Sequence, residues 1–198
     1  MEKKIIINIG RQFGSGGKDI AAALGRKLNI PVYDGELIDK AAQDSGFSAE
    51  LFKKSDEKKS FSFSALFSGA FIGDSEGYMS GSGLFKMQSE TILKIAEQGS
   101  AVIVGRCSDY ILRNHENALN VFVTAPLEDR MKRTCERGEA TPENVENFVN
   151  KKDKGREEYY NYYSFGNWGM ASNYDLCIDS EILGIEGTAD YIIEFARK

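Results

Sequence analysis

The sequence of 198 residues has little histidine and little cysteine, and each shortage disfavours a class of site. Its one histidine, His115, stands in a polar segment, and a single histidine argues against histidine-paired catalysis and histidine-rich metal sites. The three cysteines, Cys107, Cys135 and Cys177, are odd in number and widely spaced, which predicts neither a disulfide framework nor a zinc site. We expect reduced thiols and interpret Cys107 as a semi-buried structural cysteine.

Long apolar runs and an excess of positive charge are also missing. No apolar run approaches the roughly 20 residues that span a bilayer, and the first four residues lead into a strand-like run instead of a secretory signal. We therefore expect a cytoplasmic protein without a membrane partner. The formal net charge of −5 makes nucleic acid an unfavourable partner. The length of 198 residues fits one domain over residues 1–198.

Short apolar runs alternate with longer segments of helical period, a pattern typical of a parallel sheet covered by helices. Strands are predicted at residues 4–9, 31–33, 101–104, 119–123 and 174–178. Several of these runs are apolar on both faces, as expected for strands buried between two helical layers. The predicted fold class is α/β, with a five-stranded parallel sheet and helices on both faces.

Helical spacing places the connections between these strands. Ile20, Leu24 and Leu28 form one apolar stripe, and Asp19 is a candidate cap for their helix. Other helices are predicted at residues 84–97, from Thr141 onward with Thr141 as N-cap and Pro142 at the first helical position, and at residues 185–197.

The segment 60–83 does not follow this pattern, because it is rich in Phe, Ser and Gly and carries few charges. We expect it to be irregular or mobile. A long loop inside a compact domain is typically functional or disordered, and its four phenylalanines argue against plain disorder. Two interpretations stay open, a flap that covers a substrate and an apolar patch buried in the subunit contact of a homo-oligomer.

A glycine-rich turn joins the first predicted strand to the first predicted helix. It consists of Gly14, Ser15, Gly16, Gly17, Lys18 and Asp19. A buried strand that turns sharply into a helix directs backbone N–H groups and the positive end of the helix dipole at one spot, which suits a phosphate. The common spacing is G-x-x-x-x-G-K-[ST], and Gln12 stands where its first glycine belongs. If the Gly-Ser-Gly core is aligned instead, Gly17 takes the place of the usual lysine and Lys18 that of the usual hydroxyl residue.

Two more candidates follow the next two predicted strands. Ligands of open α/β sheets bind at the carboxyl ends of the strands. Arg106 follows the third predicted strand there, and its guanidinium can bind a phosphate through two hydrogen bonds. Asp34 is either a helix cap or a group that accepts a hydrogen bond from a substrate hydroxyl or amine.

A basic segment follows the fourth predicted strand. Arg130, Arg133 and Arg137 share one helical face, and residues 151–156 add further cations. Ion pairs with nearby acids are one interpretation, and arginines that close around transferring phosphates are the other. Because tyrosines and Trp168 follow, an RNA-binding surface is a third interpretation, which the acidic net charge disfavours.

Taken together, these features resemble the cytidylate kinase-like family, a branch of the P-loop nucleoside monophosphate kinases. The resemblance covers nearly the whole chain and rests on these residues: Gly10-Arg11-Gln12-Phe13-Gly14-Ser15-Gly16-Gly17-Lys18, Pro31-Val32-Tyr33-Asp34, Val104-Gly105-Arg106, Val123-Thr124-Ala125-Pro126 with Arg130 and Arg133, and Asp153, Arg156 and Trp168 ahead of Tyr174-Asp175-Leu176. Cytidylate kinases have a sequence similar to Gly-Ser-Gly-Lys-Ser-Thr at the loop and Gly-Arg-Asp after the third strand. In this chain, Gly17 and Lys18 stand at the positions of the Lys and the Ser, and Cys107 stands at that of the Asp.

The resemblance implies a three-layer P-loop kinase fold with an acceptor-side insert at about residues 35–83 and a lid at about residues 130–168. It also implies the site: residues 14–19 for ATP, Asp34 and Arg106 for the acceptor, and Lys18, Arg130, Arg133 and Arg156 for the transferred group. Mg²⁺ would bridge the ATP phosphates. The expected activity is ATP-dependent phosphoryl transfer to a nucleoside monophosphate such as CMP, and the alternative is a noncatalytic nucleotide-binding module that has lost the usual lysine.

Overall fold

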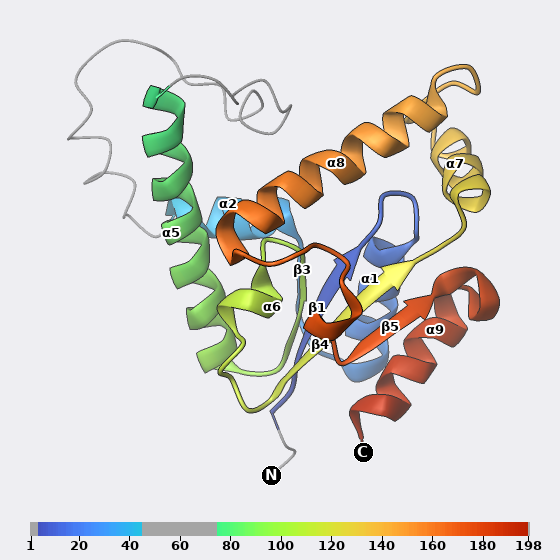
Figure 1. Cartoon of the computed structure of the whole chain (residues 1–198). Helices are drawn as coiled ribbons and strands as arrows, with labels where there is room; N and C mark the ends of the chain where they lie inside the picture. Colours follow the sequence, from blue (N-terminus) through green and yellow to red (C-terminus); the bar gives the residue numbers. More distant parts are fainter. Residues whose placement is uncertain (1–3, 45–74, 198) are drawn as a thin grey trace.

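A five-stranded parallel sheet forms the centre of the computed structural model, which describes residues 4–44 and 75–197 (Figure 1). The strand order is β2-β3-β1-β4-β5. The strands are β1 (Ile6–Arg11), β2 (Val32–Tyr33), β3 (Ala101–Val104), β4 (Ala118–Thr124) and β5 (Leu176–Asp179). All pairings are parallel, and Ile9 lies opposite Val104 on one side and Val121 on the other. The five predicted strands are confirmed.

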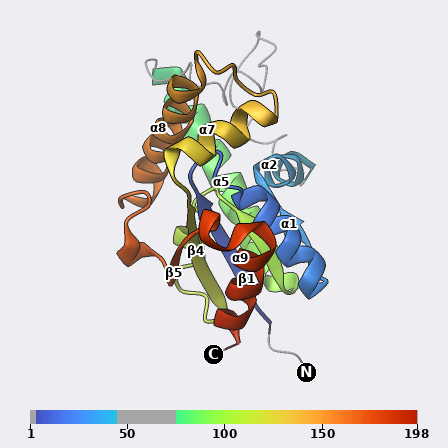
Figure 2. The same cartoon turned by 90° about the vertical axis from the view of Figure 1, so that its right-hand side faces the viewer.

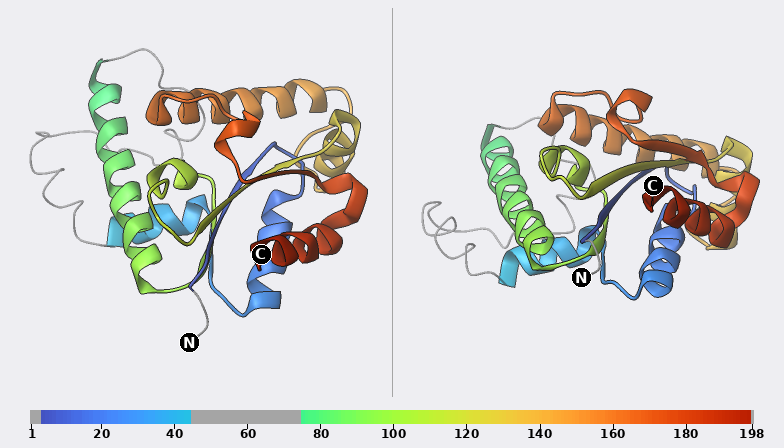
Figure 3. Two further views of the ribbon diagram at one scale, coloured as in Figure 1. Left: turned by 60° about the horizontal axis from the view of Figure 1, so that its bottom comes forward. Right: turned by 90° about the horizontal axis from the view of Figure 1, so that it is seen from below.

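Helices cover both faces of this sheet, so the predicted three-layer arrangement is also confirmed. The helices are α1 (Gly17–Leu28), α2 (Gly35–Asp44), α5 (Ser75–Gln98), α6 (Ser108–Ile111), α7 (Leu127–Glu136), α8 (Val145–Ser164) and α9 (Ser180–Ala196). Helices α1 and α9 lie side by side over one face (Figures 2 and 3). Helices α2, α5 and α6 contribute to the core on the other face.

Strand alternation explains why both faces of the sheet are apolar. Successive side chains point to opposite faces, so Ile7 and Ile9 join the core beneath α1 and α9, while Ile6 joins the core beneath α2 and α5. All three isoleucines are completely buried. A strand buried in this way is apolar on both faces, which is the pattern that predicted the sheet, and the buried Asn8 between these isoleucines bonds to the Asn120 side chain of β4.

Helix α8 lies across the end of the sheet to which the strands point (Figure 1). It runs from α7 toward α5, where Phe85 stacks on Tyr163 with ring centroids 4.1 Å apart. The carboxyl ends of β1 to β4 therefore meet a helical cover that belongs to the predicted lid segment.

Besides α5, which begins at Ser75 instead of residue 84, three predicted helix starts need correction. Helix α8 begins at Val145 with Asn144 as N-cap, not at Pro142, because Thr141 and Asn144 bond to each other in a turn: the Thr141 N–H donates to Asn144 Oδ1 and the Asn144 N–H to the Thr141 carbonyl. Helix α1 is capped by Gly16 in a left-handed conformation, and Asp19 lies inside its first turn. Helix α9 begins at Ser180 and is interrupted by Gly184 before the predicted helical stretch.

The expectation for segment 60–83 is wrong in its last nine residues, since residues 75–83 belong to helix α5. Residues 60–74, with the four phenylalanines, lie outside the described residues. Cys107, Cys135 and Cys177 are free thiols, as expected, and Cys107 is buried rather than semi-buried, which raises the pKa of its thiol. Within the described part of the chain, no helix is long and apolar enough to cross a membrane.

Candidate functional site

The glycine-rich turn leaves β1 at Arg11 and enters α1 at Gly17. Gly14 and Gly16 adopt φ angles of +76° and +78°, which L side chains rarely tolerate. At Gly14 there is also no room, because a Cβ atom would lie 2.6 Å from the backbone oxygen of Arg130 at the start of α7. Both the turn and its close contact with α7 therefore require glycine.

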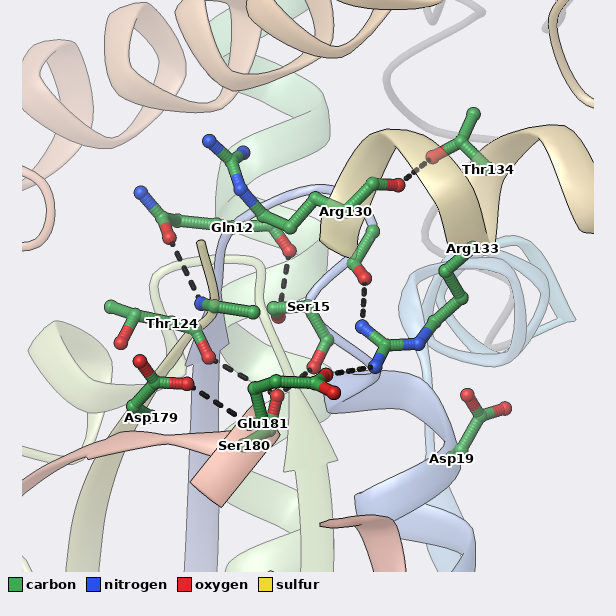
Figure 4. A network of polar contacts seen from close by, with 12 residues as sticks. Gln12, Ser15, Asp19, Thr124, Arg130, Arg133, Thr134, Asp179, Ser180 and Glu181 are labelled. Carbon is green, nitrogen blue, oxygen red and sulfur yellow. Dashed lines mark hydrogen bonds and ion pairs between the residues drawn. The ribbon is translucent and has the colours of Figure 1, made fainter. Parts of the chain in front are cut away.

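Side chains from three helices hold the carbonyl groups of this loop, and Figure 4 shows two of them, Arg133 of α7 and Ser180 of α9. Five consecutive carbonyls accept a side-chain hydrogen bond: Arg11 from Arg156 (3.1 Å), Gln12 from Ser15 Oγ (2.9 Å), Phe13 from Arg130 (3.3 Å), Gly14 from Arg133 (2.5 Å) and Ser15 from Ser180 Oγ (2.6 Å). The C=O and N–H groups of one trans peptide unit point in opposite directions. The N–H groups of Gly14 and Gly16 are consequently turned away from Arg130 and Ser180.

A phosphate fits the amide side of this loop. The first turn of a helix leaves its N–H groups without intrahelical partners, and in the described chain no side chain caps α1 at Gly16. With the helix dipole added, this end of α1 favours an anion. Asp19 forms an ion pair with Arg137 instead of capping the helix.

Two of the arginines predicted to bind phosphate, Arg130 and Arg133, bind the main chain of the loop in this structure. Arg130 is only 6% exposed, and its guanidinium lies 2.5 Å from Asp153, which also accepts the Phe13 N–H at 2.6 Å. Arg133 forms an ion pair with Glu181 at 3.1 Å while it donates to Gly14. In this structure these arginines fix the shape of the loop from outside.

Lys18 and Asp34 form an ion pair near the end of β2, on the predicted acceptor side of the loop, with 2.8 Å between ammonium and carboxylate. The Lys18 side chain is 66% exposed, and Lys18 is the second residue of α1. Burial by itself would raise the pKa of Asp34, but hydrogen bonds from Lys18 and from the Leu37 N–H outweigh it, so the pKa of Asp34 is lowered. The capping interpretation of Asp34 is thus confirmed, since its carboxylate accepts the Leu37 N–H at the start of α2, and a hydrogen bond from a substrate group stays a prediction.

Arg106 lies at the end of β3 in a left-handed turn. Gly105, Arg106 and Cys107 have φ angles of +76°, +55° and +55°, a conformation that is strained in the two non-glycine residues. The turn aims the Arg106 guanidinium at the carboxylate of Asp39 in α2, 2.8 Å away. Strain of this kind persists only where surrounding contacts determine it, and Asp39 supplies such a contact.

A buried polar network supports this pair, and sequence reasoning missed its members. Asp39 accepts a hydrogen bond from Gln88 of α5 at 2.7 Å, and Gln88 accepts one from the Tyr159 hydroxyl of α8 at 2.6 Å. Burial raises the pKa of Asp39, against the opposing effects of Arg106 and Gln88. Their only sequence signal is a polar residue on an otherwise apolar helical face, as at Gln88 beside Met87 and Ile92.

Arg11 and Arg156 place two further guanidinium groups at the same end of the sheet. Burial lowers the pKa of both, and each is also lowered by a neighbouring arginine charge. Arg156 lies over the ring of Phe13 at 5.1 Å. The sequence predicts no role for Arg11, because strand periodicity does not say what the side chain of the last strand residue contacts.

Metal-ligating side chains do not gather in groups of three anywhere in residues 4–44 and 75–197. Ser15 carries the one hydroxyl among residues 14–19, and this hydroxyl is fully buried and donates to the Gln12 carbonyl. Side-chain ligands thus do not fit a resident Mg²⁺ at the loop.

The aromatic segment considered for RNA binding is used mainly inside the protein. Tyr160 is buried and donates to Asp109 at 2.7 Å, and Trp168 packs edge-on against Phe122 at 5.3 Å. Among the rings of this segment, Tyr162 and Phe165 are exposed. This arrangement offers little of the stacking surface that single-stranded RNA requires.

Comparison with known proteins gives a family and a fold. The model of a family described as cytidylate kinase-like matches residues 6–182. A solved structure of an uncharacterized protein from Eubacterium ventriosum is 30% identical with a TM-score of 0.76, and the match covers 98% of this chain and 99% of that one. None of the curated proteins matches the sequence significantly.

Two shikimate kinases are similar in fold at low identity. The enzyme from Bacteroides thetaiotaomicron is 14% identical with a TM-score of 0.59, over 99% of this chain and 100% of that one. The enzyme from Acinetobacter baumannii, solved with shikimate, is 16% identical with a TM-score of 0.53, over 98% of this chain and 93% of that one. The sheet and its helical layers are those of the P-loop kinase fold, as expected.

Proposed function

From the premise that the chain belongs to the cytidylate kinase-like family, we propose that it transfers a phosphoryl group from ATP to a nucleoside monophosphate such as CMP. The observation that carries the proposal is the loop of residues 11–15, whose five carbonyls all accept side-chain hydrogen bonds, four of them from α7, α8 and α9, while the N–H groups of Gly14 and Gly16 are turned away from these donors. Residues 14–19 would bind the ATP phosphates. The acceptor would lie against Asp34 and Arg106, at the ends of the neighbouring strands.

Phosphoryl transfer has a loose transition state, so the protein contributes mainly positioning and positive charge. Arg156 and Lys18 would supply that charge around the transferred group, with Lys18 on the acceptor side through its pair with Asp34. Arg130 and Arg133 would keep the loop in its binding shape through the carbonyls of Phe13 and Gly14. Mg²⁺ would enter as a complex with ATP and neutralise phosphate charge.

Asp34 gives the acceptor side its selectivity in this proposal. Its pKa is lowered, so the carboxylate is ionised at neutral pH and accepts hydrogen bonds from an amine or a hydroxyl. Arg106 offers a bidentate donor for an acceptor phosphate. The lid segment 130–168 would close over the reacting groups and exclude water.

The proposal is tested by incubating the pure protein with ATP, Mg²⁺ and single acceptors: CMP, other nucleoside monophosphates, and shikimate as the acceptor of the structural neighbours. ADP release with CMP supports the proposal, and release only with shikimate replaces the acceptor class. ATP binding without turnover of any acceptor favours the noncatalytic nucleotide-binding module.

Two matched arginine variants test whether Arg106 binds the nucleoside monophosphate. Arg106→Lys removes the bidentate fork and should raise the KM for the nucleoside monophosphate. Arg113→Lys changes an exposed arginine that packs on Tyr110 and should leave that KM unchanged. Equal effects of both variants would contradict the role of Arg106.

A further inference from the structure

The side chain of Arg11 lies where the phosphate loop departs from the common pattern. A Cβ atom built at Gly17 would stand 2.7 Å from the Cβ and 2.9 Å from the Cγ of Arg11. The stem of Arg11 thus crosses the position from which the lysine of the common loop would extend, when the Gly-Ser-Gly cores are aligned. With Arg11 in this place, residue 17 must be glycine.

The other end of the same side chain reaches the strand beside β1. A Cβ atom at Gly105 would lie 2.2 Å from Nη1 of Arg11, so the guanidinium occupies the space that a side chain after β3 would fill. Arg11 therefore spans from the start of α1 to the turn that carries Arg106. Two glycines, Gly17 and Gly105, provide the room for one arginine.

The electrostatic surroundings of Arg11 favour an anion. Burial, Arg156 and Arg106 lower the pKa of Arg11 to about 9, while Asp34 and Asp153 raise it less. It remains a cation at neutral pH. Within residues 4–44 and 75–197, its guanidinium makes no hydrogen bond or ion pair. A phosphate beside it would compensate both the burial and the repulsion between the guanidinium groups.

Lys18 is poorly placed for the same task. Its ammonium pairs with Asp34 on the acceptor side and the side chain is two-thirds exposed. A lysine one residue later also leaves the helix in a different direction. Arg11, by contrast, extends from the end of β1 past Gly17 to Gly105, the residue before Arg106.

We propose that Arg11 supplies, from the end of β1, the positive charge that the loop lysine supplies in the common pattern, and that its guanidinium binds the terminal phosphates of ATP. The inference rests on the proposed function, because it takes ATP as the ligand of the loop. It explains the loss of lysine at residue 17 as a relocation of charge.

The test measures binding of a nonhydrolysable ATP analogue, AMP-PNP, with Mg²⁺ by calorimetry. Arg11→Met should weaken AMP-PNP binding at least tenfold, weaken ADP binding less and leave AMP binding unchanged. Arg11→Lys should give an intermediate loss. Lys18→Met should weaken AMP-PNP less than Arg11→Met, and Arg26→Met, at an exposed position of α1, should not change it. Thermal unfolding of each variant identifies any that fail to fold.

A relocation variant tests the packing argument. Gly17→Lys alone should weaken AMP-PNP binding because it meets the stem of Arg11, whereas Gly17→Lys combined with Arg11→Ala should bind more tightly than Arg11→Ala. Arg11→Met and Arg11→Lys variants that bind AMP-PNP within twofold of the unsubstituted protein would overturn the inference alone. Absence of AMP-PNP binding in the unsubstituted protein would overturn the proposed function as well.

Discussion

The phosphate loop and the acceptor side are built from different kinds of contact. In the loop, side chains from α7, α8 and α9 bind main-chain carbonyls, and two glycines take left-handed conformations. At the acceptor side, side chains bind one another, in the pairs Lys18–Asp34 and Arg106–Asp39.

The difference matches what each region is proposed to bind. A phosphate is recognised by amides in a fixed shape, so the loop is held in place before the ligand arrives. An acceptor is distinguished by its functional groups, and side-chain ion pairs can exchange one partner for a substrate group. Changes in the loop should therefore affect stability and ATP together, while changes at the acceptor side should affect one substrate.

The largest effect is expected for Gly14→Ala, which combines a left-handed φ with a Cβ only 2.6 Å from the Arg130 oxygen. We expect a loss of about 3 kcal/mol in unfolding free energy and loss of ATP binding. Gly138→Ala is the matched control, because Gly138 has a φ of +67° with open space around it. It should lose only about 1 kcal/mol and retain ATP binding. Urea denaturation and calorimetry measure both, and equal losses would contradict the packing argument.

The second-largest loss of unfolding free energy is expected for Arg130→Met. The variant leaves Asp153 without its cation and the Phe13 carbonyl without its donor, in a region where both side chains are largely buried. Breaking such a pair costs about 3 kcal/mol. Lys154→Met removes an exposed partner of Glu158 on α8 and should cost at most about 0.5 kcal/mol. Denaturant titration compares them, and a loss below 1 kcal/mol for Arg130→Met would show that the loop is not held in this way.

Asp39→Asn should weaken the use of the nucleoside monophosphate and leave the use of ATP unchanged. It removes the charge that positions Arg106, while the amide oxygen still accepts from Gln88. We expect the KM for the nucleoside monophosphate to rise about tenfold, equivalent to about 1.4 kcal/mol, with the KM for ATP within about twofold. Steady-state kinetics with each substrate varied in turn gives both values. A parallel rise in both would remove the distinction between the two regions.

The smallest effect is expected for the pair of Lys18 and Asp34. The pKa of Asp34 lies below its ordinary value of 3.8, so the ionised carboxylate stabilises the fold above that pH, and the contribution is lost as the pH falls through the lowered pKa. Asp34→Asn should therefore cost at most about 1 kcal/mol at neutral pH, and the difference should shrink below about pH 4. Unfolding measured from pH 7 to pH 3 checks this. A difference that widens on acidification would have the wrong sign.

The sheet was predictable because its central strands β1 and β3 are buried on both faces, so apolar residues follow one another there, as in Ile5 to Ile7 and in Val102 to Val104. The loop was predictable because its glycines stand between a strand and a helix. The polar network at Arg106 was not, since Asp39 and Gln88 are 49 residues apart and Gln88 and Tyr159 are 71 apart. The start of α8 was missed because Thr141 and Asn144 are both good caps, and their mutual hydrogen bonds decide between them.

The side chains that hold the loop come from parts of the chain far from it in sequence. The donors to the carbonyls of Gly14, Arg11 and Ser15 lie 119, 145 and 165 residues further along the chain. Contacts of such separation form late, because closing long segments of chain costs entropy before the contact repays it. The loop lies near the N-terminus but reaches its binding shape only when Ser180 is in place. Nucleotide binding thus reports the completion of folding, not the formation of the first strand and helix.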